Sequence, residues 1–363
     1  MTLRDEALGL WQAGVAAVDG YAATARALEG PAPDCILAVG KAAGTMARAA
    51  LDRYGPVPCL VVTKDGHCPG LPGHVRVIEA AHPVPDARSL VAGAALRQAV
   101  TELGRTARLI LLVSGGASSL AEDLVPGETL ESLAALNRSL LSQGLDIGAM
   151  NARRREISRI KGGGLLSGFK GTEVRVLAIS DVPRDEIAVI GSGVGAAPQS
   201  VRFAYDCRIV ASNRIARAAA EAASDRPVLA NQECLYDDVR VLALQIGARL
   251  RKMAPGVLIL GGEPTVVLPD TPGQGGRNQA LALALAREIA GHDNIAVVVG
   301  GTDGSDGPTE AAGGCVDGAT WGDGAADALR AADSGTYLAA HEALLVSGPT
   351  GTNVMDLLVA VKA

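Results

Sequence analysis

Two loops in this sequence combine glycine with groups that bind anions. Gly40-Lys41-Ala42-Ala43-Gly44 follows the apolar run Cys35–Val39, and Ser114-Gly115-Gly116-Ala117-Ser118-Ser119 follows Leu109–Val113. Glycines let the backbone approach a ligand closely, a helix N-terminus favours an anion, and Lys41 adds a positive charge. Serine hydroxyls beside paired glycines are the composition of a phosphate or carboxylate nest. Each loop taken alone is also compatible with an ordinary turn between a strand and a helix.

Carboxylates occupy similar positions further along the chain. Asp181 follows the apolar run Val174–Ile179, where it is placed to bind Mg²⁺ or to accept a hydroxyl proton. A capping or turn aspartate is the alternative reading. Asp303 and Asp306 stand three apart in a glycine-rich loop, which suits a hard cation, although the other ligand positions of an EF-hand are missing.

Two basic residues lie next to glycines. Arg277 follows Gly275-Gly276 and has the planar geometry that binds a phosphoryl group through two hydrogen bonds. Lys161 precedes three glycines and either clamps a phosphate or ends a helix. Together, the cations, the carboxylates and the small-residue loops are the parts that phosphoryl transfer requires.

The elements that position these loops are short apolar runs that alternate with helical patterns. Continuous apolar strands suit a parallel sheet covered on both faces, and the alternation predicts a doubly wound α/β fold. The first apolar pattern, over residues 8–28, predicts a helix interrupted at Asp19-Gly20. A polar break at Ser224–Pro227 and a new strand at Val257 predict two domains, residues 1–225 and 226–363. Ligands are expected at the carboxyl ends of the strands.

Composition and charge argue against some classes of function and favour a cellular compartment. The formal net charge of −6 and the lack of a basic face with interleaved aromatics argue against nucleic-acid binding. Six scattered cysteines favour a reducing compartment. No apolar stretch approaches 18 residues and no signal peptide is evident, so we expect a soluble, cytoplasmic protein without membrane attachment.

In order, the loops resemble those of the glycerate 2-kinase family, the type with an N-terminal Rossmann-like domain and a C-terminal MOFRL domain. The matching segments span nearly the whole chain: VGKAAGTMA (39–47), TKDGH (63–67), HPVPD (82–86), SGGASSL (114–120), SRIKGG (158–163), SDVP (180–183), GGEPTV (261–266), GGRNQ (275–279), GTDGSDGPT (301–309) and GPTGTNVMDL (348–357). The resemblance implies Mg²⁺-dependent transfer of the ATP γ-phosphate to the 2-hydroxyl of D-glycerate, in a cleft between the domains.

The resemblance also implies roles for single residues. Lys41, Arg277 and Asp181 are the expected catalytic residues, and Asp303 and Asp306 the expected metal ligands. The remaining expected contacts are to substrate or phosphate: Gly40, Ser114, Gly115, Gly116, Ser118, Ser119, Lys161, Glu263, Thr265, Asn278 and Thr302.

This sequence departs from the family pattern in one region. Arg184 and Gly191-Ser192-Gly193-Val194-Gly195 stand where the family has Gly-Asp and Ser-Gly-Pro-Thr, and the connection that follows is much shorter. Gly164 replaces a basic residue, and Glu310 replaces an aspartate.

These departures keep three alternatives open: a kinase of another short hydroxy acid, a hydroxypyruvate reductase, and a non-catalytic protein that binds phosphorylated metabolites. A reductase is disfavoured because no GxGxxG with a downstream acidic residue is found. The oligomeric state is open, with a homodimer as one option.

Overall fold

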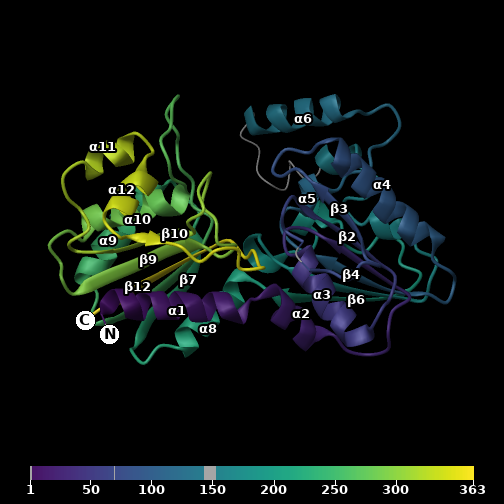
Figure 1. Cartoon of the computed structure of the whole chain (residues 1–363), viewed down its shortest axis with the longest axis horizontal. Helices are drawn as coiled ribbons and strands as arrows, with labels where there is room; N and C mark the ends of the chain where they lie inside the picture. Colours follow the sequence, from purple (N-terminus) through teal and green to yellow (C-terminus); the bar gives the residue numbers. More distant parts are fainter. Residues whose placement is uncertain (1, 69, 143–152) are drawn as a thin grey trace. The chain divides into compact units, whose positions relative to one another are not determined.

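The computed structural model describes residues 2–68, 70–142 and 153–363 (Figure 1). The chain forms two compact units, Gly20–Ser212 and Met1–Asp19 together with Asn213–Ala363. No helix in the described ranges is long and apolar enough to cross a membrane.

The Gly20–Ser212 unit is built on a six-stranded sheet in which every neighbouring pair is parallel. The spatial order is β3-β2-β1-β4-β5-β6, so the order reverses between β1 and β4. Ligands of such folds bind beside this switch point, outside the carboxyl ends of the strands. The strands are β1 (Cys35–Val39), β2 (Cys59–Lys64), β3 (Arg76–Ala80), β4 (Arg108–Val113), β5 (Glu173–Ile179) and β6 (Ala204–Ala211).

Helices cover this sheet because its central strands are apolar on both faces. All five residues of β1 are buried. Asp86 fixes the start of α4 by accepting the backbone N–H groups of Arg88 and Ser89. The helices are α2 (Gly20–Ala27), α3 (Ala43–Tyr54), α4 (Ala87–Glu102), α5 (Ala117–Leu120) and α6 (Leu130–Ser142), with 3₁₀ turns η1 (Leu165–Gly168), η2 (Pro183–Asp185) and η3 (Ile190–Gly193).

The second unit has a mixed sheet in the order β11-β10-β9-β12-β8-β7. The last strand of the chain, β12, lies antiparallel between β8 and β9, and β7 and β8 are parallel neighbours. The strands are β7 (Val228–Leu235), β8 (Gly256–Gly262), β9 (Ile295–Gly301), β10 (Gly313–Asp317), β11 (Leu344–Leu345) and β12 (Asp356–Lys362).

Helices lie on both faces of this second sheet. On one face lie α1 (Leu3–Ala17) and α8 (Asn213–Ala222). Their apolar side chains, including Trp11, pack against the buried residues of β8, β9 and β12 that point to this face. On the other face α9 (Val239–Lys252) and α10 (Arg277–Glu288) pack against the alternate residues of the same strands. Two short helices, α11 (Ala325–Arg330) and α12 (Ser334–Ala340), complete the unit.

The α/β fold class predicted from the sequence is confirmed, but the units divide at a different place. The structure separates the units between Ser212 and Asn213 and assigns residues 1–19 to the C-terminal unit, whereas the sequence predicted a division at 225/226. The reason is helix packing: α1 contacts α8, and both cover the second sheet. The polar stretch Ser224–Pro227 is only the loop from α8 to β7.

The strands that the sequence did not predict are at or near the edge of the second sheet. In β7 partly buried and exposed residues alternate, and Asn231, Gln232 and Glu233 interrupt any apolar run. β10 begins with two glycines, and β11 has two residues. Such strands lack the continuous apolar signal of a strand buried on both faces.

Candidate functional site

The first group of candidate residues lies at the switch point of the parallel sheet, where β1 and β4 end. Ser114 donates its backbone N–H to the Val39 carbonyl at 3.0 Å, and its buried hydroxyl accepts the Ala42 N–H at 3.0 Å. Gly40 has a φ of +127°, and a β-carbon there would lie 2.2 Å from Ser114 Oγ. Glycine at 40 is therefore required for the two predicted anion-binding loops to contact each other.

Lys41 and His82 converge on the second of these loops. The Lys41 N–H donates to the Gly115 carbonyl at 2.9 Å. A β-carbon at Gly116, whose φ is +82°, would lie 3.2 Å from Lys41 Cγ and 3.1 Å from His82 Cδ2. The structure thus brings together Gly40, Lys41 and the loop at Ser114, and places His82 beside them.

Within the described ranges, the amide groups of Gly115 and Gly116 donate no backbone hydrogen bond, as is typical of the N–H groups of an anion nest. The Ser119 hydroxyl donates to the Gly116 carbonyl at 3.1 Å and braces the turn. Ser118 is partly exposed. Asp181 is also partly exposed, just beyond the end of β5, which pairs with β4. If this loop binds an anion, the two glycine amides and the Ser118 hydroxyl are the donors that would contact it, whereas Ser114 and Ser119 form hydrogen bonds within the protein.

Lys161 does not join this group. Its ammonium is buried and forms an ion pair with Glu122, whose side chain has no exposed surface. The Ser158 hydroxyl donates to the same carboxylate. Burial lowers the pKa of Lys161, and the Glu122 charge opposes that effect. The structure therefore gives Lys161 an interior partner instead of the predicted phosphate contact, and the pair joins the segment before Gly162 to the segment after the Ser114 loop.

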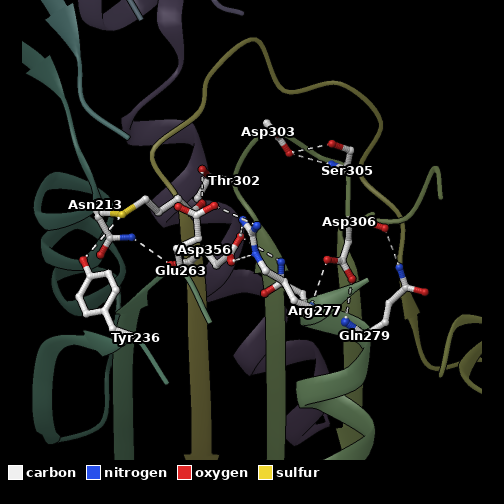
Figure 2. A network of polar contacts seen from close by, with 12 residues as sticks. Asn213, Tyr236, Glu263, Arg277, Gln279, Thr302, Asp303, Ser305, Asp306 and Asp356 are labelled. Atoms are coloured by element: carbon white, nitrogen blue, oxygen red, sulfur yellow. Dashed lines mark hydrogen bonds and ion pairs between the residues drawn. The ribbon is translucent and has the colours of Figure 1, made fainter. Parts of the chain in front are cut away.

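The second group of candidate residues lies in the other unit, around Arg277 at the first turn of α10 (Figure 2). Arg277 donates Nε to Asp356 Oδ2 at 2.6 Å and Nη2 to Asp356 Oδ1 at 3.2 Å. Its Nη1 lies 2.9 Å from Glu263 Oε1. The Asp356 side chain is 1% exposed and the Glu263 side chain 50%. Burial lowers the pKa of Arg277, but the negative charges of Asp356 and Glu263 outweigh this effect and hold the pKa above its ordinary value.

Asp306, predicted as a metal ligand, caps α10. Its Oδ1 and Oδ2 accept the backbone N–H groups of Asn278 at 3.0 Å and Gln279 at 2.8 Å. Burial raises the pKa of Asp306 to about 6 against the opposing effect of these two N–H groups. A β-carbon at Gly276 would lie 2.3 Å from Asp306 Cγ, so the glycine pair before Arg277 makes room for the cap. Asp306 is thus committed to the helix rather than to a cation.

Of the remaining predicted residues of this unit, two are buried and form hydrogen bonds to neighbouring segments, and two are partly or fully exposed. Thr302 is buried, donates to the Met355 carbonyl at 2.7 Å and accepts the Val354 N–H at 2.8 Å. Asn278 is buried and donates to Asp356 Oδ1 at 3.0 Å. Asp303 is partly exposed and accepts the backbone and hydroxyl of Ser305, each at 3.0 Å. Thr265 is exposed, and its backbone bonds to Asp237 and Val239.

Sequence reasoning did not single out Asp356 and Glu122. Asp356 begins the apolar strand β12, and an acidic residue in a strand buried on both faces was the available signal. It must be paired, because a buried charge without a partner is costly. Glu122 had no such signal. It lies in an irregular segment, and only tertiary structure brings Lys161 to it.

In the ranges that the structure describes, no three His, Cys, Asp or Glu side chains lie close enough together to hold a metal ion. A magnesium ion on a nucleotide needs only one or two carboxylates, since phosphates and waters complete its shell. Asp303 and Asp181 are partly exposed, whereas both carboxylate oxygens of Asp306 accept helix N–H groups.

Comparison with known proteins places the chain in a family. The family model described as "Domain of unknown function (DUF4147)" matches residues 6–226, and the MOFRL family model matches residues 256–356. D-glycerate 2-kinase of Thermotoga maritima is 33% identical over 90% of each chain. A putative hydroxypyruvate reductase of Agrobacterium vitis is 35% identical over 96% of this chain and 92% of the relative.

A comparison with solved structures supports the same family. The crystal structure of glycerate kinase from Thermotoga maritima superposes with a TM-score of 0.88 and 29% identity, over 99% of each chain. The strand-end loops, the two matched family models and these relatives lead to one assignment: the chain belongs to the glycerate 2-kinase family.

Proposed function

We propose that this protein is a glycerate 2-kinase, which transfers the γ-phosphoryl group of ATP to the 2-hydroxyl of D-glycerate and releases 2-phosphoglycerate and ADP. The observation that carries the proposal is the setting of Arg277. Buried Asp356 fixes the guanidinium through two hydrogen bonds, and half-exposed Glu263 holds the remaining nitrogen. A guanidinium held in this way suits the charged oxygens of a phosphoryl group, which can replace Glu263.

In the proposed reaction the 2-hydroxyl oxygen forms a bond to the γ-phosphorus, and the bond from that phosphorus to the ADP oxygen breaks. The hydroxyl proton passes to a carboxylate, for which Asp181 is the candidate. Lys41 and Arg277 stabilise the negative charge of the transferring group. The amides of Gly115 and Gly116 and the Ser118 hydroxyl bind a phosphate or the glycerate carboxylate.

Magnesium is part of the proposal as the partner of ATP. Asp303 fits it because it is a partly exposed carboxylate that follows a strand. Asp306 does not fit, because both of its oxygens accept helix N–H groups. When bound, Mg²⁺ would supply charge neutralisation on the phosphates.

The proposal is tested by ADP release from Mg·ATP with D-glycerate, L-glycerate and a panel of C3–C5 hydroxy acids. We expect turnover with D-glycerate and a product phosphorylated on the 2-hydroxyl, identified by ³¹P NMR. Turnover only with another acid would reassign the substrate and keep the kinase. Binding of ATP without turnover of any acid would replace the kinase by a binding protein.

Hydroxypyruvate reduction is the second candidate, because the Agrobacterium vitis relative carries that name. The chain offers little for a dinucleotide: the loop after β1 reads Gly40-Lys41-Ala42-Ala43-Gly44, without the GxGxxG spacing. Asp65, just beyond β2, forms an ion pair with Arg88 at 2.5 Å. Oxidation of NADH or NADPH by hydroxypyruvate, followed at 340 nm, would favour the reductase.

A further inference from the structure

A cavity of about 1000 Å³ in the Gly20–Ser212 unit is lined by basic residues and by no acidic one. Its basic residues are Arg105, Arg155, Lys161, Lys170 and Arg202. The whole chain has a formal net charge of −6, so this concentration of positive charge is a local feature. A concave, positively charged surface raises the local concentration of anions. The volume is that of a small-molecule site.

Three of these basic side chains are exposed. They are Arg105, Lys170 and Arg202, and within the described ranges their side chains form no ion pair or hydrogen bond with the protein. They stand just before β4, β5 and β6, which are parallel neighbours. The three side chains therefore share the amino-terminal edge of the sheet. Strands of six or seven residues place this edge roughly 20 Å from the loops at Lys41 and Ser114.

Two aromatic side chains line the cavity. The chain contains two phenylalanines, Phe169 and Phe203, and both line this cavity. Their rings pack edge to face with centroids 5.1 Å apart. Phe169 is buried, whereas Phe203 is partly exposed and offers ring surface to a ligand. An aromatic surface beside a cluster of cations suits a molecule that carries both a planar ring and phosphate groups.

We propose that this cavity is a second nucleotide site, separate from the catalytic loops, in which Arg105, Lys170 and Arg202 bind a di- or triphosphate and Phe203 contacts the base. The proposal does not depend on the kinase reaction, since none of these residues belongs to the groups around Lys41 or Arg277.

The test uses the full-length protein and hydrogen–deuterium exchange with ADP as the probe. We expect ADP to protect peptides covering 162–171 and 198–203. The double variant Arg105→Ala/Arg202→Ala should bind ADP at this cavity at least tenfold more weakly, the loss expected when charged hydrogen bonds are removed. The matched control Arg287→Ala/Arg330→Ala changes two exposed arginines of the other unit and should leave this protection unchanged.

Two results would overturn the proposal: no protection of these peptides at millimolar ADP, or protection that survives Arg105→Ala/Arg202→Ala. Phe203→Leu separates the base from the phosphates. This variant should weaken ADP binding at this cavity, measured as protection of peptides 162–171 and 198–203, and leave binding of inorganic pyrophosphate there unchanged. An unchanged ADP affinity of this cavity would refute the nucleotide assignment. Protection of residues 40–45 and 114–120 reports the catalytic loops, so failure of the proposed kinase site is seen separately.

Discussion

Arg277 and Asp356 are 79 positions apart in the sequence, yet the guanidinium of one is held by the carboxylate of the other through two hydrogen bonds. Arg277 begins α10 and Asp356 begins β12, so a helix start and a strand start meet at this pair. Thr302 and Asn213 bind the backbone carbonyls of Met355, Val354 and Asp356 and fix the start of the strand (Figure 2). Asp356 is thereby a positioning residue for the proposed catalytic arginine.

Arg277→Ala should lower kcat by on the order of 10³, because a transition-state guanidinium contributes at least that much in phosphoryl transfer. The measurement is ADP release with saturating Mg·ATP and D-glycerate. Arg287→Ala, an exposed arginine ten residues along the same helix, is the control and should keep full activity. A folded Arg277→Ala protein with normal turnover would remove Arg277 from the mechanism.

Asp356→Asn should lower kcat by roughly 10- to 100-fold with a smaller change in KM. The amide keeps the shape of the carboxylate but weakens a charge-assisted pair worth about 1.5–3 kcal/mol. Steady-state kinetics checks this, and a thermal melt establishes that the fold is retained. Asp327→Asn, on the surface of α11, serves as the control. Equal kcat values for the wild type and Asp356→Asn would refute the positioning role.

Lys161→Met should destabilise the protein by about 3–5 kcal/mol, because Glu122 is left buried without its partner. The double variant Lys161→Met/Glu122→Leu should recover much of this loss, since neither charge then remains unpaired. Urea unfolding measures both. Activity of the folded double variant also tests the sequence-based role of Lys161: turnover near the wild-type value supports a structural ion pair, and its complete loss supports phosphate contact.

Gly40→Ala should lower the free energy of unfolding by roughly 2–6 kcal/mol, since it combines a strained φ with a clash against Ser114. The displacement of Ser114 should also abolish activity. Gly104→Ala is the matched control, because a β-carbon there meets no atom within 4 Å and its φ is not in the left-handed region. Retention of wild-type stability by Gly40→Ala would contradict the close approach of the two loops.

The stability of the protein should depend on pH through Asp306. Its pKa is about 6 in the folded protein and 3.8 ordinarily, so between these values the folded state binds more protons than the unfolded state. The contribution of Asp306 is therefore fully present below pH 3.8 and is lost as pH rises through about 6, a change of roughly 3 kcal/mol. Urea unfolding of the wild type and Asp306→Asn at pH 4, 5, 6 and 7 measures this contribution. Parallel pH curves would show that Asp306 is not the titrating group.

The sequence by itself determined the fold class, most buried strands and the loops that carry Gly40, Lys41, Ser114 and Arg277. It could do so because strands buried on both faces are continuous apolar runs, and small residues mark the turns at their ends. The edge strand β7 left no such signal. The sequence also did not predict that α1 joins the second sheet, since that attachment depends on packing with α8 rather than on local composition.

Only the tertiary structure decided which polar residues face each other. Lys161 and Arg277 are both basic residues next to glycines, yet Lys161 is buried against Glu122 while Arg277 is 35% exposed beside Asp356. Asp303 and Asp306 belong to one loop, but Asp306 caps α10 and Asp303 stays partly exposed. The physical reason is that a charge takes its role from burial and from partners distant in the sequence, and residue type and spacing do not encode these.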